Sequence, residues 1–254
     1  MKKNTAYLIL NSITLIFALM MNYLSGTSYF GTRNVGEVSA MFQNNFTPAG
    51  YAFAIWGVIY LWLIAFVVYL WLTGNEHKQI KQIGLWFALS NVVNGLWIFA
   101  WLNLHIGISV VFMLILLASL TAITLRMRIA LWDAKLRIRA FTWWPIGIYL
   151  GWIIVATVAN ISAWLVSLGW YGGFLSPTTW SMVMIAVAAI IYLLLIQYRN
   201  MSTPALVGIW ALVAIAERQW LSKPEIAWTA LATSAILLIA VGINAFYKRT
   251  PRHA

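Results

Sequence analysis

The chain has 254 residues, of which 63% are hydrophobic and only 8% are charged, which excludes an ordinary soluble domain, where about a quarter of the residues carry charge. We therefore expect an integral membrane protein whose net charge of +11 reflects basic loops at the membrane surface and no nucleic-acid partner. The absence of cysteine excludes disulfides, thiolate metal sites and cysteine nucleophiles.

Eight apolar runs are long enough to cross a bilayer, which takes roughly 17 to 25 residues per helix. They predict an all-α, polytopic transmembrane bundle of about eight spans: 6–24, 49–72, 83–102, 106–125, 145–168, 178–198, 204–221 and 227–246. The seventh run is the weakest, because Glu217 and Arg218 lie in its last turn and must reach an interface or pair with each other. A re-entrant segment is the alternative for this run.

The longest hydrophilic connection, residues 25–47, follows the first run. Within it, Asn34 followed by Glu37 predicts a helix start, since Asn can cap the helix while Glu reaches back to the cap amide. Loops of this length are often covers over a functional site, and disorder is the alternative. A Gly-rich break at residues 169–177 divides the chain into a five-helix core, residues 1–168, and a three-helix extension, residues 169–254.

Loop charges predict the orientation of the bundle. If the eight runs alternate in direction, all of the 16 Lys and Arg residues except Arg33, Arg218 and Lys223 fall on the side of the N-terminus. Because Lys and Arg concentrate in cytoplasmic loops, we expect both termini to be cytoplasmic and residues 25–47 to lie outside.

Aromatic and amide side chains recur at helical spacing on three of the predicted helices. They are Trp56 and Tyr60 in the second run, Asn94 and Trp97 in the third, and Tyr149, Trp152, Asn160 and Trp164 in the fifth. Residues three and four apart share a helix face, and a buried amide needs a partner in lipid, so these stripes should face the bundle interior. They can serve as hydrogen-bonded glue between helices or as the wall of a ligand pocket.

Ionisable residues disfavour several functions. The five acidic residues, Glu37, Glu76, Asp133, Glu217 and Glu225, all fall in loops or at predicted span ends, so no carboxylate lies mid-membrane to couple transport to protons or sodium. His105 follows the third run at an outside turn, where an interfacial role is favoured over a metal or haem ligand. We identify no metal cluster, catalytic triad or phosphate loop, so no catalytic residue is predicted and an enzyme is disfavoured.

The fifth run resembles the TspO/MBR family, the tryptophan-rich sensory proteins related to the peripheral benzodiazepine receptor. The family pattern Y-x-x-W-x-x-x-A-x-x-x-N-x-x-x-W is matched by Tyr149, Trp152, Ala156, Asn160 and Trp164. The third run supplies the N-x-x-W element, and the second supplies W-x-x-x-Y after a proline, in the order that the family has them. The chain departs from the family in having Pro48-Ala49 in place of a double proline and in adding three helices to the usual five.

The resemblance implies a bacterial cytoplasmic-membrane protein that binds a planar hydrophobic ligand, such as a porphyrin or haem, beneath the first loop. It places Trp56, Asn94, Trp97, Trp152 and Asn160 on the pocket wall, with no required cofactor. It also implies the lipid bilayer and a homodimer as partners, although the added helices could cover the dimer surface. The alternatives are a transporter or permease for such compounds, motivated by the added helices, and tetrapyrrole degradation, which ranks last because no acid, base or metal site supports it.

Overall fold

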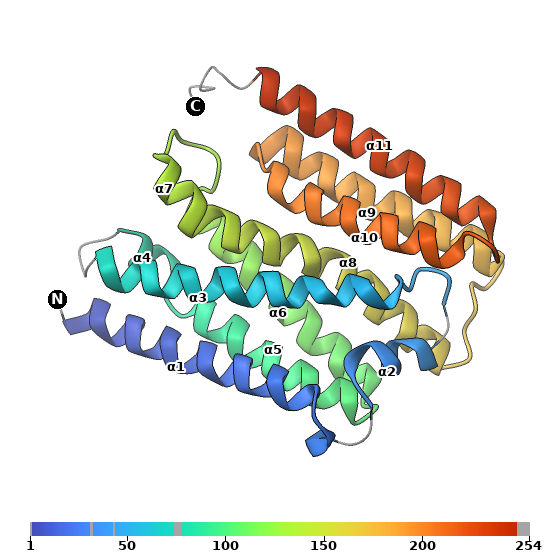
Figure 1. Cartoon of the computed structure of the whole chain (residues 1–254), viewed down its shortest axis with the longest axis horizontal. Coiled ribbons are helices and arrows are strands. Elements are labelled where there is room, and N and C mark those ends of the chain that lie inside the picture. Colours follow the sequence, from blue (N-terminus) through green and yellow to red (C-terminus); the bar gives the residue numbers. More distant parts are fainter. Residues whose placement is uncertain (1, 31–32, 43, 74–77, 248–254) are drawn as a thin grey trace.

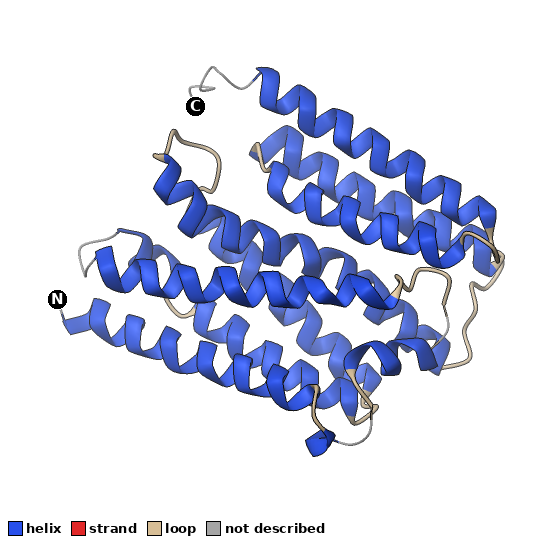
Figure 2. Ribbon diagram, viewed as in Figure 1, coloured by secondary structure: helices blue, strands red, loops and turns tan. Residues whose placement is uncertain are grey.

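The structure, a computed structural model, describes residues 2–30, 33–42, 44–73 and 78–247, and these residues form helices and loops without a strand (Figures 1 and 2). The predicted loop position of Glu76 and the basic C-terminal residues 248–254 lie outside the described residues. The all-helical prediction is therefore confirmed for the part of the chain that the structure describes.

The eight predicted runs each correspond to a long helix. In chain order the elements are α1 (Lys2–Ser25), η1 (Ser28–Phe30), α2 (Val35–Met41), η2 (Gly50–Ala54), α3 (Ile55–Thr73), α4 (Lys78–Ile83), α5 (Trp86–Leu102), α6 (Ile106–Arg126), α7 (Leu136–Ile138), η3 (Arg139–Trp143), α8 (Trp144–Ser167), α9 (Pro177–Arg199), α10 (Ser202–Gln219) and α11 (Pro224–Tyr247). The third run begins later than predicted, because Gly84 adopts a φ of +53° between α4 and α5. A left-handed residue interrupts a helix, and glycine adopts this conformation without steric cost.

Six helical stretches are long and apolar enough to cross a membrane: Asn4–Ser25, Gly50–Thr73, Ile106–Arg126, Leu136–Ser167, Pro177–Arg199 and Pro224–Tyr247. The two other predicted spans are α5, which has 17 residues, and α10, which ends on Glu217, Arg218 and Gln219. Both still pack inside the bundle, α5 between α1 and α6, and α10 against α8, α9 and α11. A polytopic helical bundle is thus confirmed.

The central helix of the bundle is α8. Its spanning stretch, together with α7 and η3, is 72% buried, whereas the other five candidate spans are 28% to 44% buried. On one side it packs against α3 and α6, and on the other against α9 and α10 (Figure 1). The start of α1 and the end of α11 lie at the same end of the bundle (Figure 1), as an even number of crossings requires.

Close backbone approach joins α8, α9 and α10. A Cβ atom on Gly151 of α8 would lie 2.7 Å from the Pro204 carbonyl oxygen of α10, and one on Gly208 of α10 would lie 2.4 Å from the Tyr192 ring of α9. The Tyr192 hydroxyl donates a hydrogen bond to the Gly151 carbonyl oxygen at 2.7 Å. Small residues allow such packing in membranes, where van der Waals contact replaces the hydrophobic effect between helices.

This packing predicts that Gly151→Ala destabilises the bundle. The added methyl group meets backbone atoms of Pro204, and overpacking of this kind costs about 1–3 kcal/mol. Thermal unfolding in detergent, followed by Trp emission, should show a lower midpoint for Gly151→Ala. The matched control is Gly242→Ala in α11, where a Cβ atom has no neighbour within 4 Å; its midpoint should be unchanged or slightly higher. Equal midpoints for both variants would contradict the close approach.

Candidate functional site

The Trp56 side chain of α3 is the centre of a cluster of aromatic rings and is only 6% exposed. Its ring stacks on Tyr60 with centroids 5.5 Å apart and lies 5.9 Å from the Trp97 ring of α5. The α8 rings of Tyr149 and Trp152 meet it edge-on at 6.0 and 6.3 Å. We call these five residues the aromatic site. The three stripes predicted from the sequence therefore converge on one point between α3, α5 and α8.

Two amides link the aromatic site to neighbouring helices. The Tyr60 hydroxyl donates to Asn94 Oδ1 at 2.8 Å, and Trp97 Nε1 donates to Asn160 Oδ1 at 2.8 Å. The amide of Asn160 in turn donates from Nδ2 to Ser109 Oγ of α6 at 2.9 Å. Ser109 was not predicted as a partner of Asn160. It lies one turn after the start of its run, and neither its residue type nor its spacing indicates this contact.

Two N–H donors at the aromatic site have no hydrogen-bond partner among the described residues. They are Asn94 Nδ2 and Trp152 Nε1, and both side chains are buried, with exposures of 0% and 2%. A buried donor without an acceptor costs about 1–3 kcal/mol, and such groups in native proteins call for an explanation by water, an ion or a ligand. The site thus combines stacked rings with hydrogen-bonding capacity that the protein itself does not use.

Trp164 is the one predicted site residue that the structure does not bring to Trp56. Its side chain is 36% exposed and lies over Gly107 of α6, where a Cβ atom would be 3.1 Å from the indole nitrogen. The reason is helical drift. Each step of four residues turns an α-helix by about 400°, so Trp164, three such steps after Trp152, is rotated by about 120° away from it.

The loop before α3 contains a short helix, α2, that lies over the end of the bundle where α3 begins (Figure 1). The predicted helix start is confirmed, because Asn34 Oδ1 accepts from the Glu37 amide at 3.0 Å and Glu37 Oε2 accepts from the Asn34 amide at 2.8 Å. This capping box begins α2. The helix is attached to α5, since Trp101 Nε1 donates to the Val35 carbonyl oxygen at 3.1 Å.

Phe53 of η2 closes the aromatic site beneath α2. Its ring meets Trp152 edge-on at 5.9 Å, and its edge lies 3.7 Å from the position of a Cβ atom on Gly36 of α2. Phe53 was not predicted as a site residue, although it precedes Trp56 by three residues and so shares its face.

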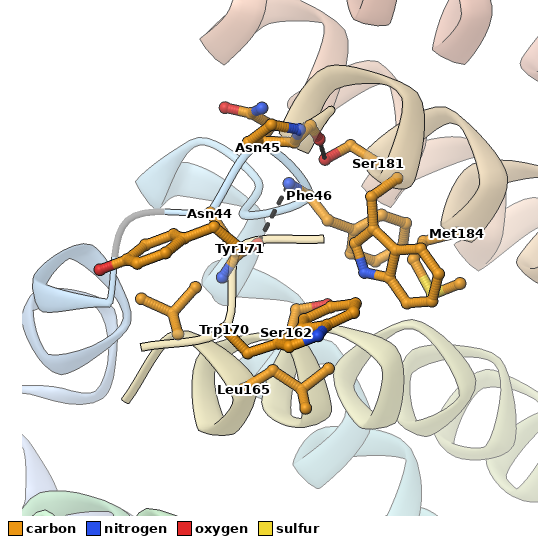
Figure 3. A pocket seen from close by; sticks show the side chains of 12 residues that line it. Asn44, Asn45, Phe46, Ser162, Leu165, Trp170, Tyr171, Ser181 and Met184 are labelled. Atoms are coloured by element: carbon orange, nitrogen blue, oxygen red, sulfur yellow. Dashed lines mark hydrogen bonds between the residues drawn. The ribbon is translucent and has the colours of Figure 1, made fainter. Parts of the chain in front are cut away.

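A small cavity lies beside Asn44, Asn45 and Phe46 (Figure 3), and Trp56 is not among the residues that line it. Its volume is about 60 Å³, and its walls are residues 44–46, the end of α8, the following loop and the start of α9. A larger, open groove of about 720 Å³ lies between α9 and α11 near Tyr198 and Tyr247. Ligand pockets usually measure about 300–1,000 Å³, so the small cavity is too small for a planar macrocycle. The groove is lined by the C-terminal parts of α9 and α11 and by Asn200, and no residue of the aromatic site lines it.

The chemistry of the aromatic site is neutral. Within the described residues, no three His, Asp or Glu side chains lie close enough to hold a metal ion. The described acidic residues Glu37, Asp133, Glu217 and Glu225 are all exposed, in loops or helix ends. The site can therefore stack against a flat ligand and donate hydrogen bonds to it without burying a charged side chain of its own.

Comparison with known proteins gives one match. A family model described as TSPO-like protein matches residues 8–243. The matched range includes α9, α10 and most of α11 as well as the first five long helices. No curated protein and no solved structure gives a significant match.

The contact between Trp97 and Asn160 predicts energetic coupling between the two side chains. Trp97→Phe and Asn160→Ala should each lower the free energy of unfolding, measured by denaturing-detergent titration, and the double variant should lose less than the sum. Interhelical hydrogen bonds in membranes contribute about 0.6–2 kcal/mol, which sets the size of the coupling. Trp97→Phe combined with Asn103→Ala, at an exposed turn, should be additive. If the losses in the free energy of unfolding of Trp97→Phe and Asn160→Ala also simply add, the hydrogen bond between Trp97 and Asn160 is ruled out.

Proposed function

The chain belongs to the TSPO-like protein family, and on this premise we propose that its aromatic site binds a planar hydrophobic ligand of the porphyrin or haem type. Family membership and the apolar helices make it a membrane protein of the tryptophan-rich sensory or binding kind. The ligand is bound as the molecule to be sensed or carried, and catalysis is not part of the proposal.

The observation that carries the proposal is the position of the two unpaired donors. Asn94 Nδ2 and Trp152 Nε1 belong to side chains that contact the stacked rings of Tyr60 and Trp56. A porphyrin offers a flat face for the rings and carboxylate oxygens at its edge for the donors. Unpaired buried atoms also occur elsewhere, as at Asn11 in α1, so the proposal depends on their coincidence with the aromatic rings.

Ligand binding requires movement of Phe53 and α2. Trp56, Tyr149 and Trp152 are each no more than 6% exposed, and Phe53 and α2 lie over them. A ligand that stacks on Trp56 must therefore displace Phe53 and shift α2 at the end of the bundle. We infer that this shift is how occupancy of the site is read outside the membrane, which suits a sensory protein.

We further propose that the end carrying α2 faces outward, in a bacterial cytoplasmic membrane. Following the helices through Figure 1, the loop between α6 and α8 and the turn between α9 and α10 lie at the end where α1 begins. These two connections contain Arg126, Arg128, Lys135, Arg137, Arg139 and Arg199. Basic residues favour the cytoplasmic side. A homodimer would use a surface other than α8, because that helix is already covered within one chain.

Titration of the purified protein with protoporphyrin tests the ligand. Trp emission of the wild type should fall along a saturable, stoichiometric curve. Trp152→Phe keeps an aromatic ring but removes the indole N–H, and it should weaken binding about five- to tenfold, the equivalent of one hydrogen bond. Trp228→Phe is the control, since this side chain is 63% exposed at the start of α11, and its affinity should equal that of the wild type.

Two results would count against the proposal: quenching that does not saturate, and equal affinities for Trp152→Phe and the wild type. Proteoliposomes distinguish binding from transport. Accumulation of porphyrin inside vesicles that contain the protein, above that in empty vesicles, would favour a permease.

A further inference from the structure

The segment that leads into α3 is held by α10, a helix that lies about 160 positions later in the sequence. We call residues 44–54 the pre-α3 segment; it carries Phe53 and ends two residues before Trp56. Four hydrogen bonds connect it to α10: Ala49 N to Ala214 O at 3.0 Å, Trp210 Nε1 to Ala52 O at 3.2 Å, Arg218 Nη1 to Pro48 O at 3.3 Å, and Gln219 Nε2 to Asn45 O at 3.1 Å.

Three of these bonds satisfy backbone groups that have no regular partner, namely Asn45 O, Pro48 O and Ala49 N. The fourth adds a second donor to Ala52 O, which already accepts from the Ile55 N–H. The pre-α3 segment contains only the short 3₁₀ turn η2, so most of its carbonyl groups lie outside a helical hydrogen-bond ladder. Residues 46–49 and 52 are buried, and an unpaired backbone carbonyl is costly where water cannot solvate it. Side chains of α10 supply three of the four donors, and the Trp210 ring also meets Tyr51 edge-on at 5.3 Å.

Apolar packing alone leaves the segment room to shift. Phe46 is 1% exposed and shares the cavity of about 60 Å³ with Leu165 of α8 and Met184 of α9 (Figure 3). A void removes dispersion contacts from the side chains that line it. The hydrogen bonds to α10 therefore fix the position of the segment together with the burial of Phe46 and Ala52.

We propose that Trp210, Arg218 and Gln219 are positioning residues for the aromatic site. They fix the pre-α3 segment, the segment fixes Phe53 and the start of α3, and these in turn set the placement of Trp56 and the closure over Trp152. This proposal rests on the proposed ligand-binding function, which gives the positioning its purpose. It also assigns the last three helices, through α10, a role at the aromatic site. Displacement of α10 relative to α8 would then open or close the access to the rings.

Hydrogen exchange of the ligand-free, full-length protein in nanodiscs tests the positioning role without reference to any ligand. In Arg218→Ala and in Trp210→Phe, which keeps the ring but removes the donor, amides of residues 44–54 should exchange about tenfold faster, the effect of losing one hydrogen bond. Exchange in α5 and α8 should stay unchanged. Arg218→Lys keeps a cationic donor and should restore slow exchange. Lys223→Ala, which removes the same charge in the turn after α10, is the matched control.

A merely structural role would lower the thermal midpoint and speed exchange throughout the bundle, whereas the proposal requires a local change with rescue by Arg218→Lys. Exchange of residues 44–54 that equals the wild type in both variants overturns the proposal, as does a bundle-wide increase. Protoporphyrin titration of the same variants is read separately. If local exchange is faster but porphyrin affinity is unchanged, the positioning role is overturned. If the wild-type protein binds no porphyrin and the variants still exchange faster, the α10 contacts are supported and the proposed ligand is overturned.

Discussion

The structure depends on one constraint, which is that polar groups placed inside a lipid bilayer must find partners within the chain. This constraint explains why the amides lie where they do. Asn160 accepts from Trp97 and donates to Ser109, so that one side chain joins α5, α6 and α8. The Tyr192 hydroxyl joins α9 to α8 in the same manner. Each bond contributes modestly, about 0.6–2 kcal/mol, but each also fixes the rotation of its helices, and the aromatic rings stack only at that rotation.

The sequence is sufficient to predict the helices and the capping box at Asn34, because both follow from local patterns: apolar run length and a cap residue three positions from its partner. The convergence of the aromatic and amide stripes is predicted as well, since an amide inside the membrane is less costly where it meets partners on neighbouring helices. The sequence does not predict the partners themselves. Ser109 is one of four hydroxyl side chains in its apolar run, and its spacing does not mark it as the partner of Asn160. Trp164 matches the four-residue spacing yet rotates off the face, because small angular steps accumulate along α8.

Contacts between distant segments are the least predictable part. Pro48 and Ala52 accept hydrogen bonds from α10, and nothing in the residues near either position indicates such a partner. The sequence suggests a boundary near residues 169–177, where Gly169, Gly172 and Gly173 indeed adopt positive φ. Across that loop, however, α10 packs closely on α8, and the family match extends over both parts. The last three helices are therefore integrated with the first five in packing and in their hydrogen bonds to the loop before α3.

A membrane site must discriminate its ligand from the hydrocarbon chains that surround it at high concentration. Aromatic rings alone cannot do so, because an acyl chain also fills apolar space. The unpaired donors of Asn94 and Trp152 supply the difference. A hydrocarbon leaves both N–H groups unpaired, whereas a ligand with acceptor oxygens at its edge pairs them. A site that hydrogen-bonds its ligand rejects analogues without the bonding group far more strongly than an apolar pocket rejects a ligand of another size. Neutral donors also avoid the desolvation cost of burying a charged side chain in the ligand-free protein. For the proposed ligand, the polar edge, more than the flat face, would thus determine the specificity of the site.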